Sequence, residues 1–239
     1  MLSSRRREKK NVNRLYTVKS DAQVIFMLGD LYVFWFEYKT VVPKGFVRVL
    51  GKLAELSDAG IQFYYFVGNH DLWMRDYFTT ELNIPVFHQP QYYKIGQKTF
   101  LIGHGDGLGP GDKGYKRMKK VFVNPFSKWL YRWLHPDWGV RLARHLSLKN
   151  KLISGKEDVV YLGKEGEWLA QYAEMKQKEK PTDFFVFGHR HLPIDMKIGD
   201  QARYINLGDW IQYFSYGVFD GNTFLLKGFD TDQPLTIHS

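Results

Sequence analysis

The chain has no cysteine among its 239 residues. Disulfide bonds, thiolate metal sites and cysteine nucleophiles are therefore excluded, and any bound metal must be held by His, Asp, Glu or Asn. Such ligands suit Mn, Fe, Zn or Mg. Long hydrophobic runs are also missing, because no segment approaches the roughly 18 apolar residues of a membrane-spanning helix. Residues 1–10 are too charged for a signal peptide, so we expect a cytoplasmic protein.

Acidic residues are scarce in one segment of the chain. Residues 113–151 hold eleven Lys or Arg residues and a single acidic residue, Asp137, so this segment accounts for the whole net charge of +9. A basic patch of this kind can face nucleic acid, an anionic lipid surface or a phosphorylated substrate, and charge alone does not choose among them. A merely solvated face is the remaining interpretation.

Four apolar runs rich in β-forming residues end abruptly in Gly followed by polar residues, at positions 24–28, 61–67, 99–102 and 184–187. Continuous apolar runs of this length are typical of buried strands. Between the first two, residues 43–59 begin with Pro and end before a Gly, which predicts a helix. This β-helix-β order favours parallel strands with reactive groups at their carboxyl ends.

The remaining segments differ in pattern. Residues 115–134 have aromatic and apolar residues at spacings of three and four, which predicts amphipathic helices. Another helix is predicted over residues 155–180, ended by Pro181, and short runs punctuated by glycine over 194–229 suggest antiparallel strands. We therefore predict an α/β fold of two packed sheets flanked by helices. It forms a single domain over residues 1–239, with a helical insertion at about 112–180.

The polar residues after the four runs form one candidate site. A carboxylate, an amide and three imidazoles should converge at one edge of a sheet, supplied by Asp30, Asn69, His104, His189 and His191. Each buried polar group without a partner costs about 1 to 3 kcal/mol, and a metal ion would satisfy them together.

The order G-D, G-N-H-D, G-H-G-D and G-H-R-H along the chain is similar to the signature of the calcineurin-like phosphoesterases, which have a β-sandwich flanked by helices. The resemblance implies that Asp30 bridges two metals. It also implies that Asn69, His104 and His189 complete one metal site and that His191 binds the other metal. His70 resembles the catalytic histidine beside the phosphoryl group, with Asp71 as the partner that fixes its tautomer.

Longer stretches, LGDLYVFWFEY at 28–38, GNHDLW at 68–73 and HGDGLGPGDKGY at 104–115, resemble the UDP-2,3-diacylglucosamine pyrophosphatases of lipid A biosynthesis. The resemblance implies that the substrate is a nucleotide-linked lipid, split at its pyrophosphate into 2,3-diacylglucosamine 1-phosphate and UMP. It also implies manganese dependence, peripheral association with the inner membrane, and an insertion that forms a cap over the two acyl chains. Asp112 and Tyr115 match positions that contact the sugar.

The residues of the insertion agree with a lipid substrate. Aromatic side chains such as Trp129 and Trp133 could shelter acyl chains, although they could also only pack the helices onto the sheet. Basic residues would meet phosphates and lipid headgroups, and among them we select Arg144, Lys149 and Lys151.

One part of the family pattern is missing. The superfamily opens with a strand ending in Asp-x-His, which supplies two metal ligands, whereas before Asp30 this chain has only Glu8 and Asp21 as acidic residues and no histidine. Val33 also stands where the family has an acidic residue. We expect one metal site to remain, the other to be weak, and the edge of the next strand to be exposed. Two explanations compete, a start codon assigned too far downstream and a truncated paralogue.

Three functions follow from these observations. The first is a metal-dependent phosphoesterase of the lipid A pathway, with activity in doubt because of the missing Asp-x-His. A catalytically impaired paralogue or truncated product that binds lipid or nucleotide is the second, and a phosphodiesterase acting on a nucleotide or nucleic acid is the third. The aromatic residues of the insertion favour lipid over nucleic acid.

Overall fold

The computed structural model describes residues 8, 10, 12–17, 21–32, 34–111, 113–143, 160–163, 165–231 and 233–235. The strands are β1 (Val24–Met27), β2 (Gln62–Phe66), β3 (Val86–Phe87), β4 (Gln91–Ile95), β5 (Lys98–Gly103), β6 (Phe184–Phe187), β7 (Pro193–Ile198), β8 (Ala202–Leu207), β9 (Ser215–Phe219) and β10 (Phe224–Gly228). The helices are α2 (Val47–Asp58), α3 (Tyr77–Leu82), α4 (Lys113–Val123), α5 (Pro125–Arg132) and α7 (Trp168–Glu179).

The strands form three sheets in the described part of the chain. The first is a parallel sheet in the order β1-β2-β3. The second has the order β4-β5-β6-β8-β7, with β5, β6 and β8 parallel and β4 and β7 antiparallel at its edges. The third is the antiparallel pair β10-β9. The predicted β-helix-β unit is confirmed, since α2 joins β1 to β2 and these two strands are parallel.

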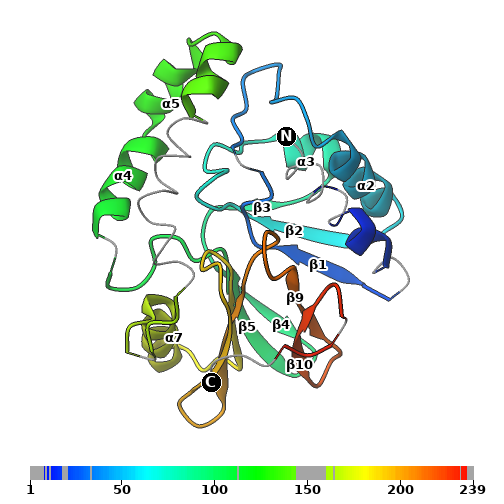
Figure 1. The fold of residues 1–239 in the computed structure, drawn as a ribbon, viewed down its shortest axis with the longest axis vertical. Helices are drawn as coiled ribbons and strands as arrows, with labels where there is room; N and C mark the ends of the chain where they lie inside the picture. Colours follow the sequence, from blue (N-terminus) through cyan, green and yellow to red (C-terminus); the bar gives the residue numbers. More distant parts are fainter. Residues whose placement is uncertain are drawn as a thin grey trace.

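Alternate side chains of each central strand enter different hydrophobic layers. On β2, Phe66 lies in a core that it shares with Phe184 of β6, while Tyr65 faces the core under α2 and α3. On β6, Phe185 faces the other way, toward Leu169 of α7. The protein is therefore layered as helix, sheet, sheet and helix, with α2 and α3 on one outside and α7 on the other (Figure 1).

Three details of the sequence-based picture are corrected. The helix predicted over 43–59 begins at Val47, because Gly45 and Phe46 have φ values of 114° and 56°, which no α-helix accepts. The helix predicted over 155–180 begins at Trp168 within the described residues, after a turn that contains Gly163 with φ 77°. The four site-bearing strands belong to two sheets, not to one, so the site lies between two sheet edges.

Strand β1 forms one edge of its sheet. In the described residues it pairs only with β2, and none of its residues is fully buried. One edge of β1 is therefore unpaired within the described residues.

Helices α4 and α5 stand apart from the sheets, at the upper left of Figure 1. Residues 136–143 continue this helical segment. We call the helical segment 113–143 the cap. In contrast α7, although it falls within the predicted insertion, packs its buried residues on the five-stranded sheet and belongs to the body.

Candidate functional site

Four predicted site residues lie together at the carboxyl ends of β1, β2, β5 and β6. The Nε2 atom of His104 lies 3.2 Å from Asn69 Oδ1 and 3.4 Å from Asp30 Oδ2. The Nδ1 atom of His189 lies 3.1 Å from the same Asn69 oxygen. The sheets therefore bring a carboxylate, an amide and two imidazoles into direct contact, and we call these residues the four-donor cluster.

The backbone around the cluster is shaped to let these side chains meet. Asp30 and His189 both adopt left-handed conformations, with φ values of 53° and 66°. Such conformations cost a non-glycine residue on the order of 1 kcal/mol or more and concentrate at functional sites. At Gly68, a Cβ atom would lie 2.3 Å from Asp30 Oδ1 and 2.8 Å from the His104 ring. Only glycine leaves room for the two side chains at this position.

The tautomer of His104 is set by the backbone. Its Nδ1 atom lies 2.6 Å from the carbonyl oxygen of Leu28, which can only accept a hydrogen bond, so Nδ1 carries the proton. In the neutral ring, Nε2 then presents a lone pair to the oxygens of Asp30 and Asn69. Facing acceptors repel one another unless a proton or a cation lies between them.

The charges of the cluster depend on one another. Burial alone would raise the pKa of Asp30, but the imidazoles of His104 and His70 outweigh it and hold that pKa below its ordinary value. Burial opposes a charge on His104 as well, yet the carboxylate of Asp30 raises its pKa above the usual range. For His189, burial and repulsion by His104 lower the pKa to about 4, so this ring is neutral at pH 7.

The chemistry of the cluster fits a divalent cation. A carboxylate, an amide oxygen and two imidazoles are ligands that Mn, Fe, Zn and Mg accept in different proportions. A backbone carbonyl that fixes the tautomer of a histidine is the usual support of a metal ligand. In the described part of the chain, however, no three His, Asp or Glu side chains are arranged to hold a metal ion. The fit to a divalent cation therefore rests on the chemical types of the four donors, including the amide of Asn69. That these four residues are metal ligands stays a prediction.

His191 has a partner of its own outside the four-donor cluster. Its Nδ1 atom is 3.3 Å from Asp209 Oδ2. Asp209 is buried in the loop after β8, and its other oxygen accepts the backbone N–H groups of Ile211, Gln212 and Tyr213 at 2.8 to 3.1 Å. Burial would raise the pKa of Asp209, but His191 and these N–H groups hold it below the usual value. Asp209 was missed in the sequence, although it follows a strand in a Gly-Asp pair as Asp30 does.

The two predicted catalytic residues have different surroundings. The backbone N–H of His70 donates to Asp30 Oδ1 at 2.9 Å. Asp71 is fully buried, accepts the hydroxyl of Tyr65, and accepts the Gly68 N–H at 2.5 Å. Burial, with the nearby charge of Asp30, raises the pKa of Asp71 to about 7. Asp71 thus holds the turn that carries Asn69 and His70, and its role in fixing the His70 tautomer stays a prediction.

A second missed residue, Asp106, joins the cap to the site. The hydroxyl of Tyr115 donates to Asp106 Oδ2 at 2.5 Å, and the ammonium of Lys119 lies 2.6 Å from the same oxygen. Tyr115, predicted to contact a sugar, therefore faces Asp106, which stands two residues after His104. The other predicted substrate residues, Asp112, Arg144, Lys149 and Lys151, lie outside the described residues.

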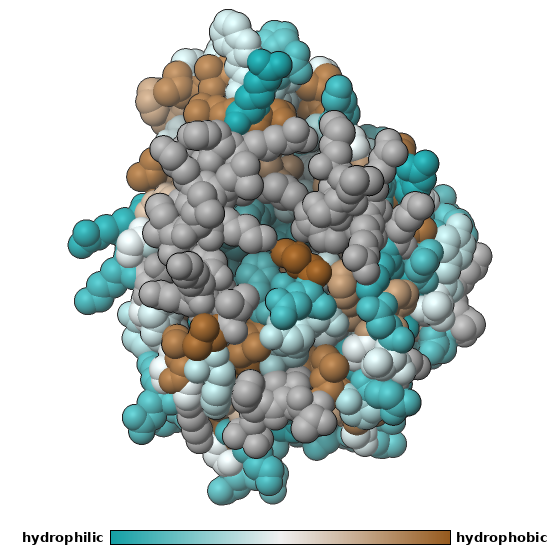
Figure 2. All heavy atoms as spheres, viewed as in Figure 1, coloured by the Kyte–Doolittle hydropathy of each residue, from teal (hydrophilic) through white to brown (hydrophobic). Residues whose placement is uncertain are grey.

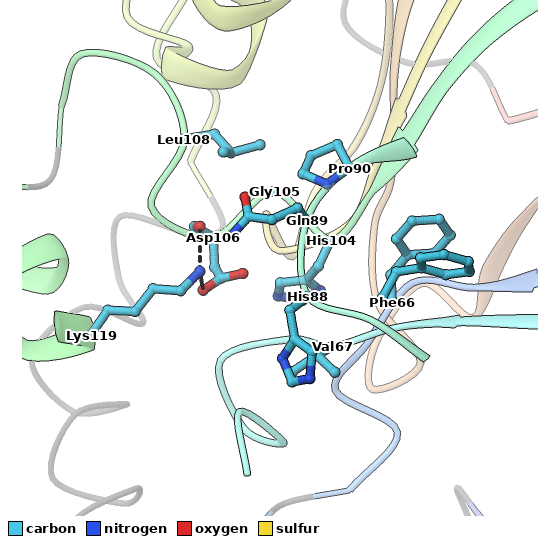
Figure 3. Close-up of a pocket in the computed structure, with 11 residues that line it drawn as sticks. Phe66, Val67, His88, Gln89, Pro90, His104, Gly105, Asp106, Leu108 and Lys119 are labelled. Carbon is cyan, nitrogen blue, oxygen red and sulfur yellow. Dashed lines mark hydrogen bonds and ion pairs between the residues drawn. The ribbon is translucent and has the colours of Figure 1, made fainter. Parts of the chain in front are cut away.

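A small pocket opens beside His104. Figure 3 shows the Asp106–Lys119 pair on one side and His88 on the other. Burial and the positive charge of Lys128 hold the pKa of His88 below its ordinary value. His88 follows β3, the third parallel strand of its sheet. Unlike the four donors, it does not come directly after a glycine, so no signal in the sequence indicates it. The residues lining the pocket are Phe66, Val67, Phe87, His88, Gln89, Pro90, His104, Gly105, Asp106, Leu108 and Lys119.

The cap has two unlike faces. Its inner face packs on Trp73, whose indole N–H donates to the carbonyl of Phe122 at 2.6 Å and whose ring lies 4.5 Å from that of Tyr131. Its outer face leaves large apolar side chains in solvent, with exposed fractions of 67% for Phe126 and 74% for Trp133. Figure 2 shows hydrophobic and hydrophilic residues interleaved at this end of the molecule. Phe122 therefore helps to hold the cap on the body, while the outer aromatic side chains do not pack the helices onto the sheet.

Helices long and apolar enough to cross a bilayer are absent from the described residues.

Known proteins resemble this chain over most of its length. Residues 6–193 match the calcineurin-like phosphoesterase family. A UDP-2,3-diacylglucosamine hydrolase of Porphyromonas gingivalis is 40% identical, covering 90% of this chain and 87% of that protein. The protein of the same name in Pseudomonas fluorescens strain Pf-5 is 28% identical, covering 87% and 83%. A solved structure, GAP50 of the Plasmodium inner membrane complex, has a TM-score of 0.45 at 13% identity, covering 97% of this chain and 83% of that one.

Proposed function

Because this chain belongs to the calcineurin-like phosphoesterase family, we propose that it is a metal-dependent hydrolase of UDP-2,3-diacylglucosamine. The relative that is 40% identical carries that activity in its name and aligns with 90% of this chain. The observation that carries the proposal is the contact of the four donors, supplied by four strand ends in the order that the family signature has. The products would be 2,3-diacylglucosamine 1-phosphate and UMP.

Asp30, Asn69, His104 and His189 would hold one divalent ion, for which we propose manganese, with iron, zinc and magnesium as the alternatives. When bound, such an ion polarises phosphoryl oxygens and lowers the pKa of a coordinated water. His191 would contribute to a second metal site.

The residues around the ion would orient the pyrophosphate. Asp71 and Gly68 hold the turn that carries His70, and we propose that the His70 side chain contacts the phosphoryl group under attack. The oxygen of water forms a bond to phosphorus and releases a proton to the solvent, the bond from that phosphorus to the bridging oxygen breaks, and the leaving phosphate takes the electron pair. The low pKa of Asp30 keeps its carboxylate charged and ready for a cation at neutral pH.

The outer face of the cap supports a membrane-bound substrate. Exposed aromatic side chains next to basic ones are typical of proteins that lie at an anionic membrane surface. Trp129 and Trp133 supply such aromatics, and Arg132 lies between them in the sequence. We propose that the protein works at the cytoplasmic face of the inner membrane, with the cap toward the lipid.

The alternative within the same family is a protein that binds the nucleotide-linked lipid without splitting it. Binding and hydrolysis can be measured on the same sample, so the two functions are separable.

The test is hydrolysis of UDP-2,3-diacylglucosamine by purified protein with excess manganese, with UMP release as the readout. We expect UMP release, and a loss of about 100-fold or more in the Asp30→Asn and His104→Gln variants, because the first removes the carboxylate charge and the second removes an imidazole from the proposed metal site. Saturable binding without UMP release would establish the silent binding protein instead. Cleavage of single-stranded DNA or bis-p-nitrophenyl phosphate, with no action on the lipid, would reject the proposed substrate.

A further inference from the structure

The loops after β6 and β8 meet through one contact between side chains. These strands are parallel neighbours in the five-stranded sheet, so their carboxyl ends lie side by side. The first loop carries His191 and the second carries Asp209, with Nδ1 and Oδ2 3.3 Å apart. The side chain of Asp209 is only 8% exposed and that of His191 is 23% exposed. The imidazole is thus accessible while the carboxylate behind it is not.

The carboxylate of Asp209 is held rigidly. Its Oδ1 atom accepts three backbone N–H groups, which leaves Oδ2 for His191. The preceding Gly208 has φ 73°, and a Cβ atom there would lie 2.6 Å from Ser215 Oγ. Asn206 connects both loops, because it donates to the carbonyl of Gly188 and accepts the N–H of Gly208 at 3.1 Å. The turn is therefore fixed relative to the loop that carries the histidine.

We propose that Asp209 is a positioning residue that fixes the tautomer of His191. A carboxylate only accepts hydrogen bonds, so the proton of the neutral ring is kept on Nδ1 and the lone pair stays on Nε2. A ring held in this way can offer Nε2 to a divalent cation, and a carboxylate behind a metal-binding histidine also fixes the orientation of the ring. The metal-binding part of this inference rests on the proposed function, whereas the tautomer does not.

Another aspartate provides a matched control. Asp220, in the turn between β9 and β10, accepts the N–H groups of Asn222 and Thr223 through Oδ1 at 2.9 and 2.8 Å. This is the same kind of turn, without a histidine among these partners. If Asp209 only builds a turn, replacing either aspartate by asparagine should have the same small effect, because asparagine forms such turns equally well.

The test compares Asp209→Asn and Asp220→Asn by nitrogen-15 NMR of the histidine rings in metal-free protein. It is run at about pH 8, above the ordinary titration range of imidazoles, and the His191 signals are assigned with a His191→Gln variant. In Asp209→Asn the amide would donate to Nδ1 and move the proton to Nε2. We expect this tautomer to switch in Asp209→Asn and to stay unchanged in Asp220→Asn.

Zinc titration by calorimetry on the same samples gives the second readout. We expect Asp209→Asn to weaken zinc binding at the site containing His191 by about 10 to 100-fold, with no change in Asp220→Asn. An unchanged tautomer, or a switched tautomer with unchanged zinc binding, would overturn the proposal. Failure of the unmodified protein to hydrolyse the lipid would reject only the proposed function, because the tautomer is measured without substrate or metal.

Discussion

The strand ends and the cap differ in how tightly their side chains are packed. At the strand ends, each donor of the four-donor cluster has another donor within 3.1 to 3.4 Å, and Gly68 has no room for a methyl group. In the cap, Trp133 has 74% of its surface in solvent, and the inner face rests on a few aromatic contacts around Trp73. The comparison teaches that sheet topology determines which strand-end residues meet, whereas an amphipathic helix can direct its apolar residues to the protein or away from it.

Replacing Trp73 by alanine is the strongest way to separate the cap from the body. The side chain is only 8% exposed, and its ring contacts Phe36, Phe122 and Tyr131. We expect Trp73→Ala to lower the free energy of unfolding in urea by about 3 to 5 kcal/mol. Trp133→Ala should change it by less than about 0.5 kcal/mol. Similar losses in both variants would show that the outer aromatics are packed in solution.

Replacing Gly68 by alanine tests the crowding at the strand ends. A methyl group 2.3 Å from Asp30 Oδ1 must displace that carboxylate, so we expect manganese affinity, measured by calorimetry, to fall about 100-fold. Gly51→Ala in α2 is the control, because nothing lies within 4 Å of its added methyl group. Equal manganese affinity in the two variants would mean that the four-donor cluster tolerates a displaced Asp30.

The smallest expected effect concerns the outer face of the cap. Changing Trp129 and Trp133, which are 52% and 74% exposed, to serine should lower binding to vesicles of anionic phospholipid by about 10-fold, since buried aromatic area drives such binding. Sedimentation of the protein with vesicles measures it. Val47→Ser, at a residue that is 70% exposed on the body, should leave vesicle binding unchanged. Vesicle binding that survives loss of both tryptophans would assign another surface to the membrane.

The meeting of the four donors could be predicted from the sequence because these residues follow strands. Asp30, Asn69, His104 and His189 each come directly after a Gly at the end of an apolar run, and parallel strands place such positions at adjacent edges. Asp209 also follows Gly, but a Gly-Asp pair in a tail of short strands is not distinctive, and its partner His191 lies 18 positions earlier in the sequence.

Other features depended on tertiary structure. The division of the four strands between two sheets could not be predicted, because each strand alone has the same pattern. The start of α2 was placed too early because Pro43 is a typical first residue of a helix, whereas the conformation of Gly45 and Phe46 delays it. Both faces of the cap are rich in aromatic residues, so the sequence alone does not show which face packs on the body. The contacts of Trp73 with Phe122 and Tyr131 identify the inner face.

Asp106 has a consequence for protein engineering. Its carboxylate receives both Tyr115 and Lys119, which lie four positions apart on α4, while its own loop carries His104. Any helical segment transplanted from a relative in place of α4 must therefore bring a hydroxyl and an ammonium group one helical turn apart. A chimera without that spacing would leave a nearly buried carboxylate beside the four-donor cluster without its hydroxyl and ammonium partners, however well the apolar surface of the new helix packed.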